Sequence, residues 1–206
     1  MLSNLALLLL LAAAPARAED WLLSAQRAAA SAAIPGESAP EKSKSDWVPY
    51  EPASRLFRAD LPPAGWRPFE EDDALGSVVR ILGPDDPSGA LRATLSVRLV
   101  DRDSPVFTPV KAAVEGMRRQ GPGRETTTVQ SLRIPAGLAR IFEITEIRRV
   151  PDTATSAPLE IHQYVAVIPR GEAYFVVRLV TARENYLEYR EDYVRFLKSL
   201  KPVGAR

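Results

Sequence analysis

The sequence LEIHQYVAVIPRGEAYFVVRLVT, residues 159–181, contains two strand-like segments joined by a short turn. Residues 159–168 and residues 173–181 are rich in β-branched and aromatic side chains, which favour strands. The connection, Pro169-Arg170-Gly171-Glu172, is too short for a parallel return, which needs about a dozen residues or more. These residues therefore predict an antiparallel hairpin.

Further strand-like segments extend the sheet around this hairpin. Residues 91–100 alternate apolar and polar side chains, which places the two kinds on opposite faces of a strand. Turn-forming residues precede this segment at 83–89 and separate two later ones at 151–158. The remaining strand-like segments are residues 66–69, 75–82, 129–134 and 138–150. Together the segments predict an antiparallel sheet of about six strands.

Two helices are predicted beside the sheet. The first covers residues 109–120, because Thr108 is a suitable N-cap and Pro109 suits the first helical position. The second follows Thr181-Ala182-Arg183-Glu184, which has the spacing of a capping box. Its large side chains recur every three or four positions, so they are expected to face the sheet: Tyr186, Tyr189, Tyr193, Phe196, Leu197 and Leu200.

These elements predict one α+β domain over residues 46–206. The acidic run Glu70-Glu71-Asp72-Asp73 is interpreted as a solvated turn within it, because four neighbouring carboxylates repel one another unless they are hydrated or bound to a cation. Residues 19–45 are expected to form a short helix and a flexible linker, since an Ala-rich stretch is followed by Pro, Ser and charged residues.

The amino-terminal residues have the pattern of a secretory signal peptide. Residues 5–14, LALLLLLAAA, are uncharged and apolar, and Ala16 and Ala18 form the small-x-small pattern that signal peptidase recognises. The run is shorter than the roughly 20 residues that span a bilayer. Residues 1–18 are therefore predicted to be removed on export to the periplasm or the extracellular space, leaving no transmembrane anchor. The alternatives are a buried helix or a signal anchor.

Composition excludes several kinds of site. The chain has 27 basic and 26 acidic residues, so it lacks the strong positive charge of a nucleic-acid-binding domain. It has no Cys, which excludes disulfides, thiolate nucleophiles and a lipoprotein anchor. One His excludes a triple-His metal site within one chain. No cofactor is expected.

Three stretches resemble a known structural group. They are Pro63-Ala64-Gly65-Trp66, the strand segment YFVVRL at 174–179, and the closing helix that ends in FLKSLK at 196–201. With these stretches the chain resembles the PsbP-like α/β/α sandwich, a group that includes the Mog-type Ran-binding proteins and the bacterial DcrB-like exported proteins. The resemblance covers about residues 50–202. It implies that fold and a binding or accessory role, without naming a partner.

The only histidine, His162, is the centre of the candidate site. On a strand, Glu160, His162 and Tyr164 share one face. Tyr174 and Arg178, on the neighbouring strand, are expected to approach them. This group is compatible with a base or metal ligand beside Glu160. The favoured interpretation is a histidine on the surface of the sheet, among polar and aromatic neighbours.

Loop carboxylates are a second candidate, because Ca²⁺ prefers oxygen ligands. They occur at 70–73, at 85–86 and at Asp101 and Asp103, but none has the spacing of an EF-hand loop. Solvated loop charge is the favoured interpretation. Glu143 and Glu146 are not spaced to share a strand face, which gives no support to a paired-carboxylate glycosidase.

The sequence thus favours a non-catalytic exported binding or accessory protein, monomeric, whose partner is an envelope protein or a small ligand. Two alternatives remain open. One is a small hydrolase, metal-assisted or not, that uses His162. The other is a carrier of lipids or other small ligands, which requires an apolar pocket beside the sheet.

Overall fold

A computed structural model describes residues 47–203, except residues 64, 74, 86–90 and 150–156. The predicted signal peptide, the linker over 19–45, most of the loop at 83–89 and most of the connection at 151–158 lie outside the described residues. The chain divides into two units, and every described residue belongs to the second, Lys42–Arg206. Within the described residues, no helix has the length and apolar character needed to cross a bilayer.

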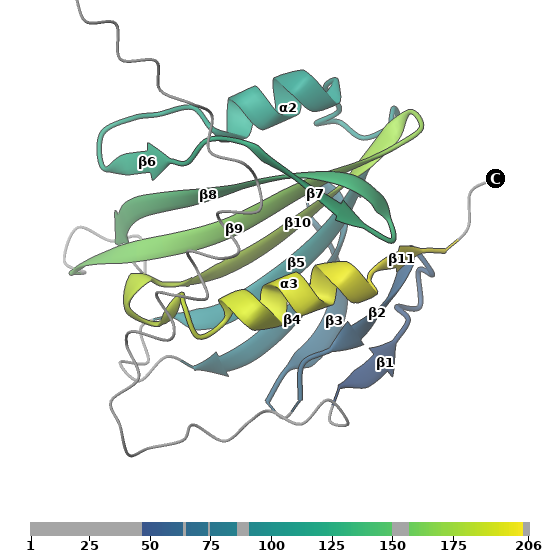
Figure 1. Ribbon diagram of the computed structural model, residues 1–206, viewed down its shortest axis with the longest axis horizontal. Coiled ribbons are helices and arrows are strands. Elements are labelled where there is room, and N and C mark those ends of the chain that lie inside the picture. The colour runs from purple at the N-terminus through teal and green to yellow at the C-terminus, as the bar shows by residue number, and fades with distance from the viewer. Residues whose placement is uncertain (1–46, 64, 74, 86–90, 150–156, 204–206) are drawn as a thin grey trace, which may run out of the picture. The chain divides into compact units, whose positions relative to one another are not determined.

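The described strands form one large antiparallel sheet and one small one (Figure 1). The large sheet has the order β3-β4-β5-β10-β9-β8-β6, and β7 also pairs with β8. Its strands are β3 (Arg67–Asp73), β4 (Gly76–Asp85), β5 (Arg92–Val100), β6 (Arg124–Thr126), β7 (Gln130–Ile134), β8 (Gly137–Arg149), β9 (Pro158–Arg170) and β10 (Ala173–Ala182). The prediction of about six strands is therefore corrected to eight in this sheet. A strand as short as β6 shows no apolar alternation by which it could have been recognised.

The predicted hairpin is confirmed as β9 and β10, near the middle of the large sheet. Ala173 pairs with Arg170, so the turn is tighter than expected and contains only Gly171 and Glu172. Gly171 has φ of +56°, a conformation that glycine adopts without steric cost. Every residue from Ile161 to Ile168 is buried, because both faces of β9 are covered.

Two helices cover the two faces of the large sheet. α2 (Val110–Met117) packs in a cluster with Val165, Val167 and Tyr174. α3 (Arg190–Ser199) packs in a second, larger cluster. This cluster contains the neighbouring residues of the same two strands, among them Ala166 of β9 and Phe175 of β10. Since successive side chains of a strand point to opposite faces, α2 and α3 lie on opposite sides of the sheet. The layers are those of the predicted α/β/α sandwich.

A small sheet completes the core on the α3 side. Its strands are β1 (Val48–Tyr50), β2 (Phe57–Leu61) and β11 (Lys201–Pro202), in the order β1-β2-β11. Phe57 is fully buried and meets Phe196 of α3 edge to face, with ring centroids 6.2 Å apart. The sequence patterns did not predict this sheet, because prolines interrupt the segment and argue against strands there. They indicated only an aromatic segment leading into the domain.

Both helices begin later than predicted. β10 continues through Thr181, which pairs with His162 and is buried, so the expected capping box is instead the end of a strand. A short 3₁₀ turn, η2 (Arg183–Asn185), follows before α3 starts. In α2, the residue at the N-cap position is Pro109 and no side chain caps the helix. Strand pairing with β9 outweighs the local preference for a cap at Thr181.

The acidic run is also placed differently from the prediction. Glu70 to Asp73 form most of β3, and each carboxylate has a protein partner. Glu70 accepts hydrogen bonds from the backbone N–H groups of Ala53 and Ser54. Asp73 pairs with Arg98 of β5 and lies 3.5 Å from a guanidinium nitrogen of Arg80. The described residues contain no group of three or more side chains suited to hold a metal ion.

Replacing Phe196 with Ala should lower the free energy of unfolding by about 3–5 kcal/mol, because it leaves a cavity in the centre of the larger cluster. Denaturant unfolding followed by circular dichroism measures the change. Phe69→Ala is the matched control, since that ring is 37% exposed and contributes much less. Equal losses in the two variants would contradict this placement of the core.

The Asp73→Asn variant should show a stability defect that depends on pH. The hydrogen bond from Arg98 holds the pKa of the Asp73 carboxyl below its usual range. Because this pKa is lower in the folded protein, the ionised Asp73 carboxylate stabilises the fold at pH values above the usual pKa of Asp. The stabilisation is lost as the pH falls through the lowered pKa and the carboxylate is protonated. Urea midpoints should therefore differ between wild type and variant at neutral pH and converge in acid. A gap that is constant from neutral pH down to strongly acid conditions would contradict this role of Asp73.

Candidate functional site

His162 lies within the core of the α3 side, and its ring is almost fully enclosed. Its Nδ1 is 3.1 Å from the hydroxyl of Thr145, on the adjacent strand β8. Its Nε2 is 3.2 Å from a carboxylate oxygen of Glu143, although the angle is not that of a hydrogen bond. Only 2% of the residue is exposed, so the expectation of a histidine on the sheet surface is wrong: the ring is buried because the segment after β10 covers this face. The imidazole therefore has a neighbour at each nitrogen and no open side.

Aromatic rings close the remaining space around His162. The ring centroids of Tyr164 and Tyr186 lie 4.8 Å and 4.1 Å from that of the imidazole. Arg183 stacks over Tyr186 at 4.1 Å and also lies 3.6 Å from Glu160. The hydroxyl of Tyr164 donates to the backbone carbonyl of Tyr186, and burial raises the pKa of this phenol. This arrangement holds the segment after β10 against the sheet.

The structure separates the predicted site residues into two groups. Glu160, His162 and Tyr164 share the α3 side, as their spacing predicts. Tyr174 and Arg178 were expected to approach them, but they lie on the α2 side, so this expectation is wrong. In the β9–β10 register His162 pairs with Thr181 and Tyr164 with Leu179, which are odd-numbered residues of β10. In a hairpin with an even number of turn residues, each even-numbered position of one strand pairs with an odd-numbered position of the other. The even-numbered Tyr174 and Arg178 therefore cannot share a face with His162, and the sequence already contained this information.

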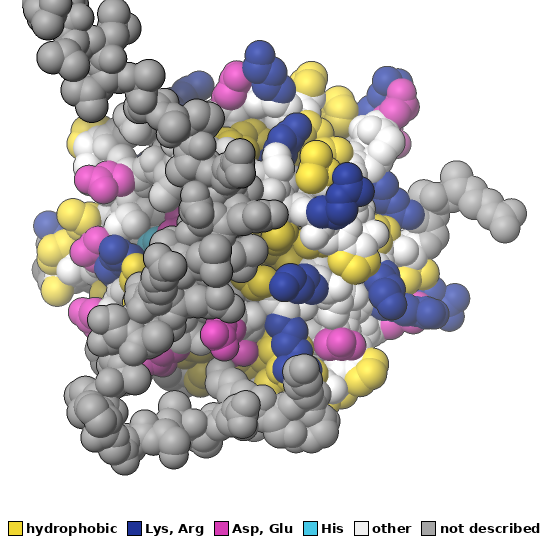
Figure 2. All heavy atoms as spheres, viewed as in Figure 1, with side chains coloured by type: hydrophobic (Ala, Val, Ile, Leu, Met, Phe, Trp, Pro, Cys, Tyr) yellow, Lys and Arg dark blue, Asp and Glu magenta, His cyan; other side chains and the backbone are white. Residues whose placement is uncertain are grey.

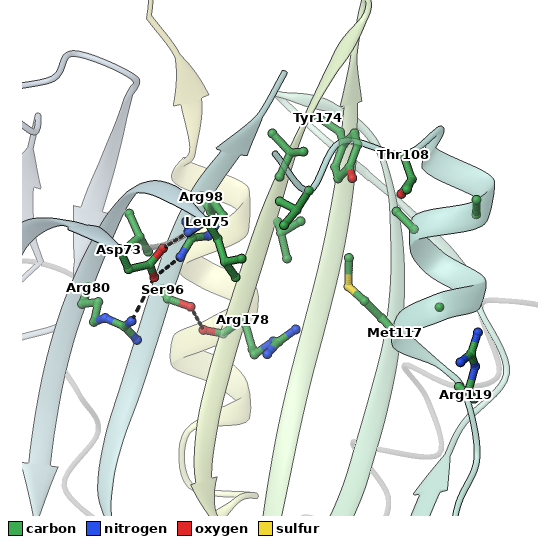
Figure 3. A pocket seen from close by; sticks show the side chains of 17 residues that line it. Asp73, Leu75, Arg80, Ser96, Arg98, Thr108, Met117, Arg119, Tyr174 and Arg178 are labelled. Atoms are coloured by element: carbon green, nitrogen blue, oxygen red, sulfur yellow. Dashed lines mark hydrogen bonds and ion pairs between the residues drawn. The ribbon is translucent and has the colours of Figure 1, made fainter. Parts of the chain in front are cut away.

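On the α2 side, a cavity of about 650 Å³ lies between the helix and the large sheet (Figure 3). Strands β3, β4, β5 and β10 supply its floor, and α2 with the segment before it supplies one wall. The apolar lining residues are Leu75, Val78, Val100, Val106, Ala112, Ala113, Met117, Tyr174 and Val176. The volume is in the range of sites that bind small molecules, about 300–1,000 Å³.

The polar part of the lining is strongly basic. Arg80, Arg98, Arg119 and Arg178 line the cavity together with one acidic residue, Asp73, which gives a net charge of +3 from five side chains. The whole chain has a net charge of only +1. On the face shown in Figure 2, both basic and acidic side chains of the described residues reach the surface.

Arg178 and Arg119 are the two arginines of the lining without an ion pair among the described residues, and Arg178 is the less exposed of the two. Its side chain points from β10 into the cavity toward Met117 (Figure 3). Among the described residues it has no side-chain hydrogen bond or ion pair, and its Nε is buried without an acceptor. Burial lowers the pKa of its guanidinium.

The nearest acidic influence on Arg178 is Glu146, a buried residue of β8. This carboxylate is already occupied: Arg124 lies 2.9 Å and Arg148 lies 2.7 Å from its oxygens, and Gln163 donates a hydrogen bond to it. Because Arg124 and Arg148 already neutralise the charge of Glu146, this carboxylate does not serve as the counterion of Arg178. The guanidinium is thus available to an anion that enters the cavity.

A smaller cavity of about 350 Å³ lies beside β3 and β4. It is lined by Ser54, Leu56, Glu70, Glu71, Asp72, Ser77, Val78 and Val79. Its carboxylates are engaged by backbone N–H groups, by Arg80 and by the hydroxyl of Ser77, so they are not free to bind a cation. His162 lines neither of the two cavities.

The chain matches no protein-family model and no curated protein. Among solved structures, the Ran-binding protein Mog1p of Saccharomyces cerevisiae is 12% identical, with a TM-score of 0.50 over 76% of this chain and 95% of that one. The cyanobacterial PsbP of Synechocystis, CyanoP, is 11% identical, with a TM-score of 0.45 over 82% of this chain and 99% of that one. A structure from Bacteroides thetaiotaomicron is 8% identical, with a TM-score of 0.48 over 77% of this chain, which spans only 49% of that protein. At these identities the likeness concerns the fold alone, and it confirms that the described residues have the Mog/PsbP-like α+β fold.

Proposed function

We propose that this protein is a non-catalytic exported binding protein that holds a small ligand in the cavity beneath α2. The observation that carries the proposal is the cavity itself, about 650 Å³ of space with apolar walls and a basic floor. A pocket with mainly apolar walls and a few convergent polar groups is the usual form of a small-molecule site. The sequence-based hypothesis of a small-ligand carrier required such a pocket beside the sheet.

The chemistry of the lining favours binding over catalysis. A general acid or base must lie within hydrogen-bonding reach of the substrate and be free to exchange a proton. The only carboxylate among the lining residues, Asp73, is bound to Arg98 and lies close to Arg80. The hydrolase hypothesis depends on His162, which is enclosed on the opposite side of the sheet. A substrate in the cavity would be out of its reach.

Two further observations support the location and the general role. The apolar run at residues 5–14, followed by the small residues of the predicted cleavage site, favours export. Mog1p, which has this fold, is a Ran-binding protein. A binding role is therefore compatible with the fold, and an envelope protein that exchanges the ligand is the partner we expect.

Gly116→Leu should abolish ligand binding without destabilising the fold. Gly116 lines the cavity from α2, and a Cβ at this position has nothing within 4 Å. A leucine side chain would occupy the cavity, while leucine is the better helix former by roughly 0.5–1 kcal/mol. Fluorescence titration of the full chain with anilinonaphthalene sulfonate, an anionic apolar probe, measures the loss.

The matched control is Gly121→Leu. This glycine also has open space around its Cβ position but is not among the lining residues. It should bind the probe as the wild type does, and thermal melts should show that both variants are folded. Unchanged probe binding by a folded Gly116→Leu variant would overturn the proposed site.

His162→Ala should reduce stability and leave ligand binding unchanged. The substitution removes the partner of the Thr145 hydroxyl and a ring packed against Tyr164 and Tyr186, so we expect a loss of about 1–3 kcal/mol. Urea unfolding and probe titration of the same preparation measure the two effects. A variant of wild-type stability with altered binding would instead indicate a functional histidine.

A further inference from the structure

We propose that the ligand is an amphiphile with a single anionic headgroup, such as a medium-chain carboxylate, and that Arg178 binds the headgroup while the apolar walls hold the chain. This inference rests on the proposed function, because it assigns a ligand class to the same cavity. It is supported by a difference among the arginines of the lining: some form ion pairs with carboxylates, and Arg178 does not.

Two of the four lining arginines are already neutralised. Arg98 donates a hydrogen bond to Asp73 and another to the backbone carbonyl of Gly76, at 2.8 Å. Arg80 pairs with Glu71 and approaches Asp73. These contacts fix both guanidinium groups against β3 and β4. They line the cavity and are not free to turn toward a ligand.

Arg178 differs because its donors have no acceptor within the described residues. Arg178 is partly buried, and its Nε is enclosed without an acceptor, which is unfavourable; an anion that enters the cavity would supply that acceptor. The planar group donates two parallel hydrogen bonds to a carboxylate, which gives both strength and orientation. Arg119 lies on the exposed surface at the carboxyl-terminal end of α2, so it can attract an anion toward the cavity.

The number of free charges limits the headgroup. Of the two lining arginines without an ion pair among the described residues, Arg119 is exposed, and only Arg178 has an enclosed donor without an acceptor. One such guanidinium matches one negative charge, whereas a phosphate monoester carries nearly two charges and three acceptor oxygens. Much of the remaining lining is apolar, including Val100, Val176 and Met117. Such walls favour a hydrocarbon chain, which loses unfavourable contact with water when it is buried.

The test compares ligands of equal chain length and different charge. Isothermal titration of the full chain with dodecanoate, dodecanol and dodecyltrimethylammonium measures three affinities. Each ligand is kept below the concentration at which it forms micelles or separates from solution. We expect dodecanoate to bind at least about tenfold more tightly than dodecanol, since one hydrogen-bonded charge pair accounts for such a factor. The cationic ligand should not bind.

Arg178→Met should abolish the preference for dodecanoate and retain the affinity for dodecanol, because it keeps an unbranched apolar side chain and removes the charge. Arg178→Lys should retain part of the preference. Arg133→Met is the control for net charge, since that residue is exposed on β7 and does not line the cavity. It should behave as the wild type.

The outcomes separate the two proposals. Equal affinities of the wild type for dodecanoate and dodecanol would overturn the headgroup assignment and leave the binding cavity in place. Binding of neither ligand, together with an unchanged probe titration in Gly116→Leu, would overturn both. An equal loss in Arg178→Met and Arg133→Met would show a general effect of charge and would overturn the role of Arg178. The comparison of ligands on the wild type does not depend on the folding of any variant.

Discussion

The register between β9 and β10 is the constraint on which the rest of the structure depends. Each of these central strands supplies side chains to two different clusters in alternation, one on each face of the sheet. A shift of one residue would exchange the two sets. Arg178 would then enter the aromatic core beneath α3, and Thr181 would leave its place opposite His162. The tight turn at Gly171 and Glu172 fixes this register.

The two sides of the sheet satisfy their polar groups in different ways. On the α3 side, His162 has Thr145 and Glu143 as neighbours and aromatic rings around it, and the phenol of Tyr193 donates to the backbone carbonyl of Val177 at 3.0 Å. On the α2 side, Arg178 has no such partner among the described residues. Natural sequences place unsatisfied groups at functional sites more often than elsewhere. On the α3 side, His162 Nε2 and Thr181 Oγ1 also lack a hydrogen-bond partner, but both residues are enclosed by protein, whereas Arg178 lines a cavity. The unsatisfied group that a ligand can reach is therefore on the α2 side.

The sequence predicted the features that depend on local pattern. The central hairpin, the alternation in β5 and the aromatic stripe of α3 follow from residue types and their spacing. It did not predict β2 or the start of α3, because those depend on which distant strand each segment meets. Arg178 was recognised as a candidate but assigned to the wrong face, although the even number of turn residues already places it opposite to His162. The cavity had no sequence signal, since its lining comes from β3, β4, β5, β10 and α2.

The cavity follows from the difference in length between α2 and the strands beneath it. A helix of 8 residues covers about 12 Å, whereas a strand of 10 residues such as β10 extends over about 33 Å. The short helix leaves part of this face uncovered, and Asp73 holds Arg80 and Arg98 beside that opening. The α3 side keeps its packing whatever occupies the cavity, because the two clusters share strands but no side chains. The larger of the two clusters therefore lies on the face of the sheet opposite to the cavity.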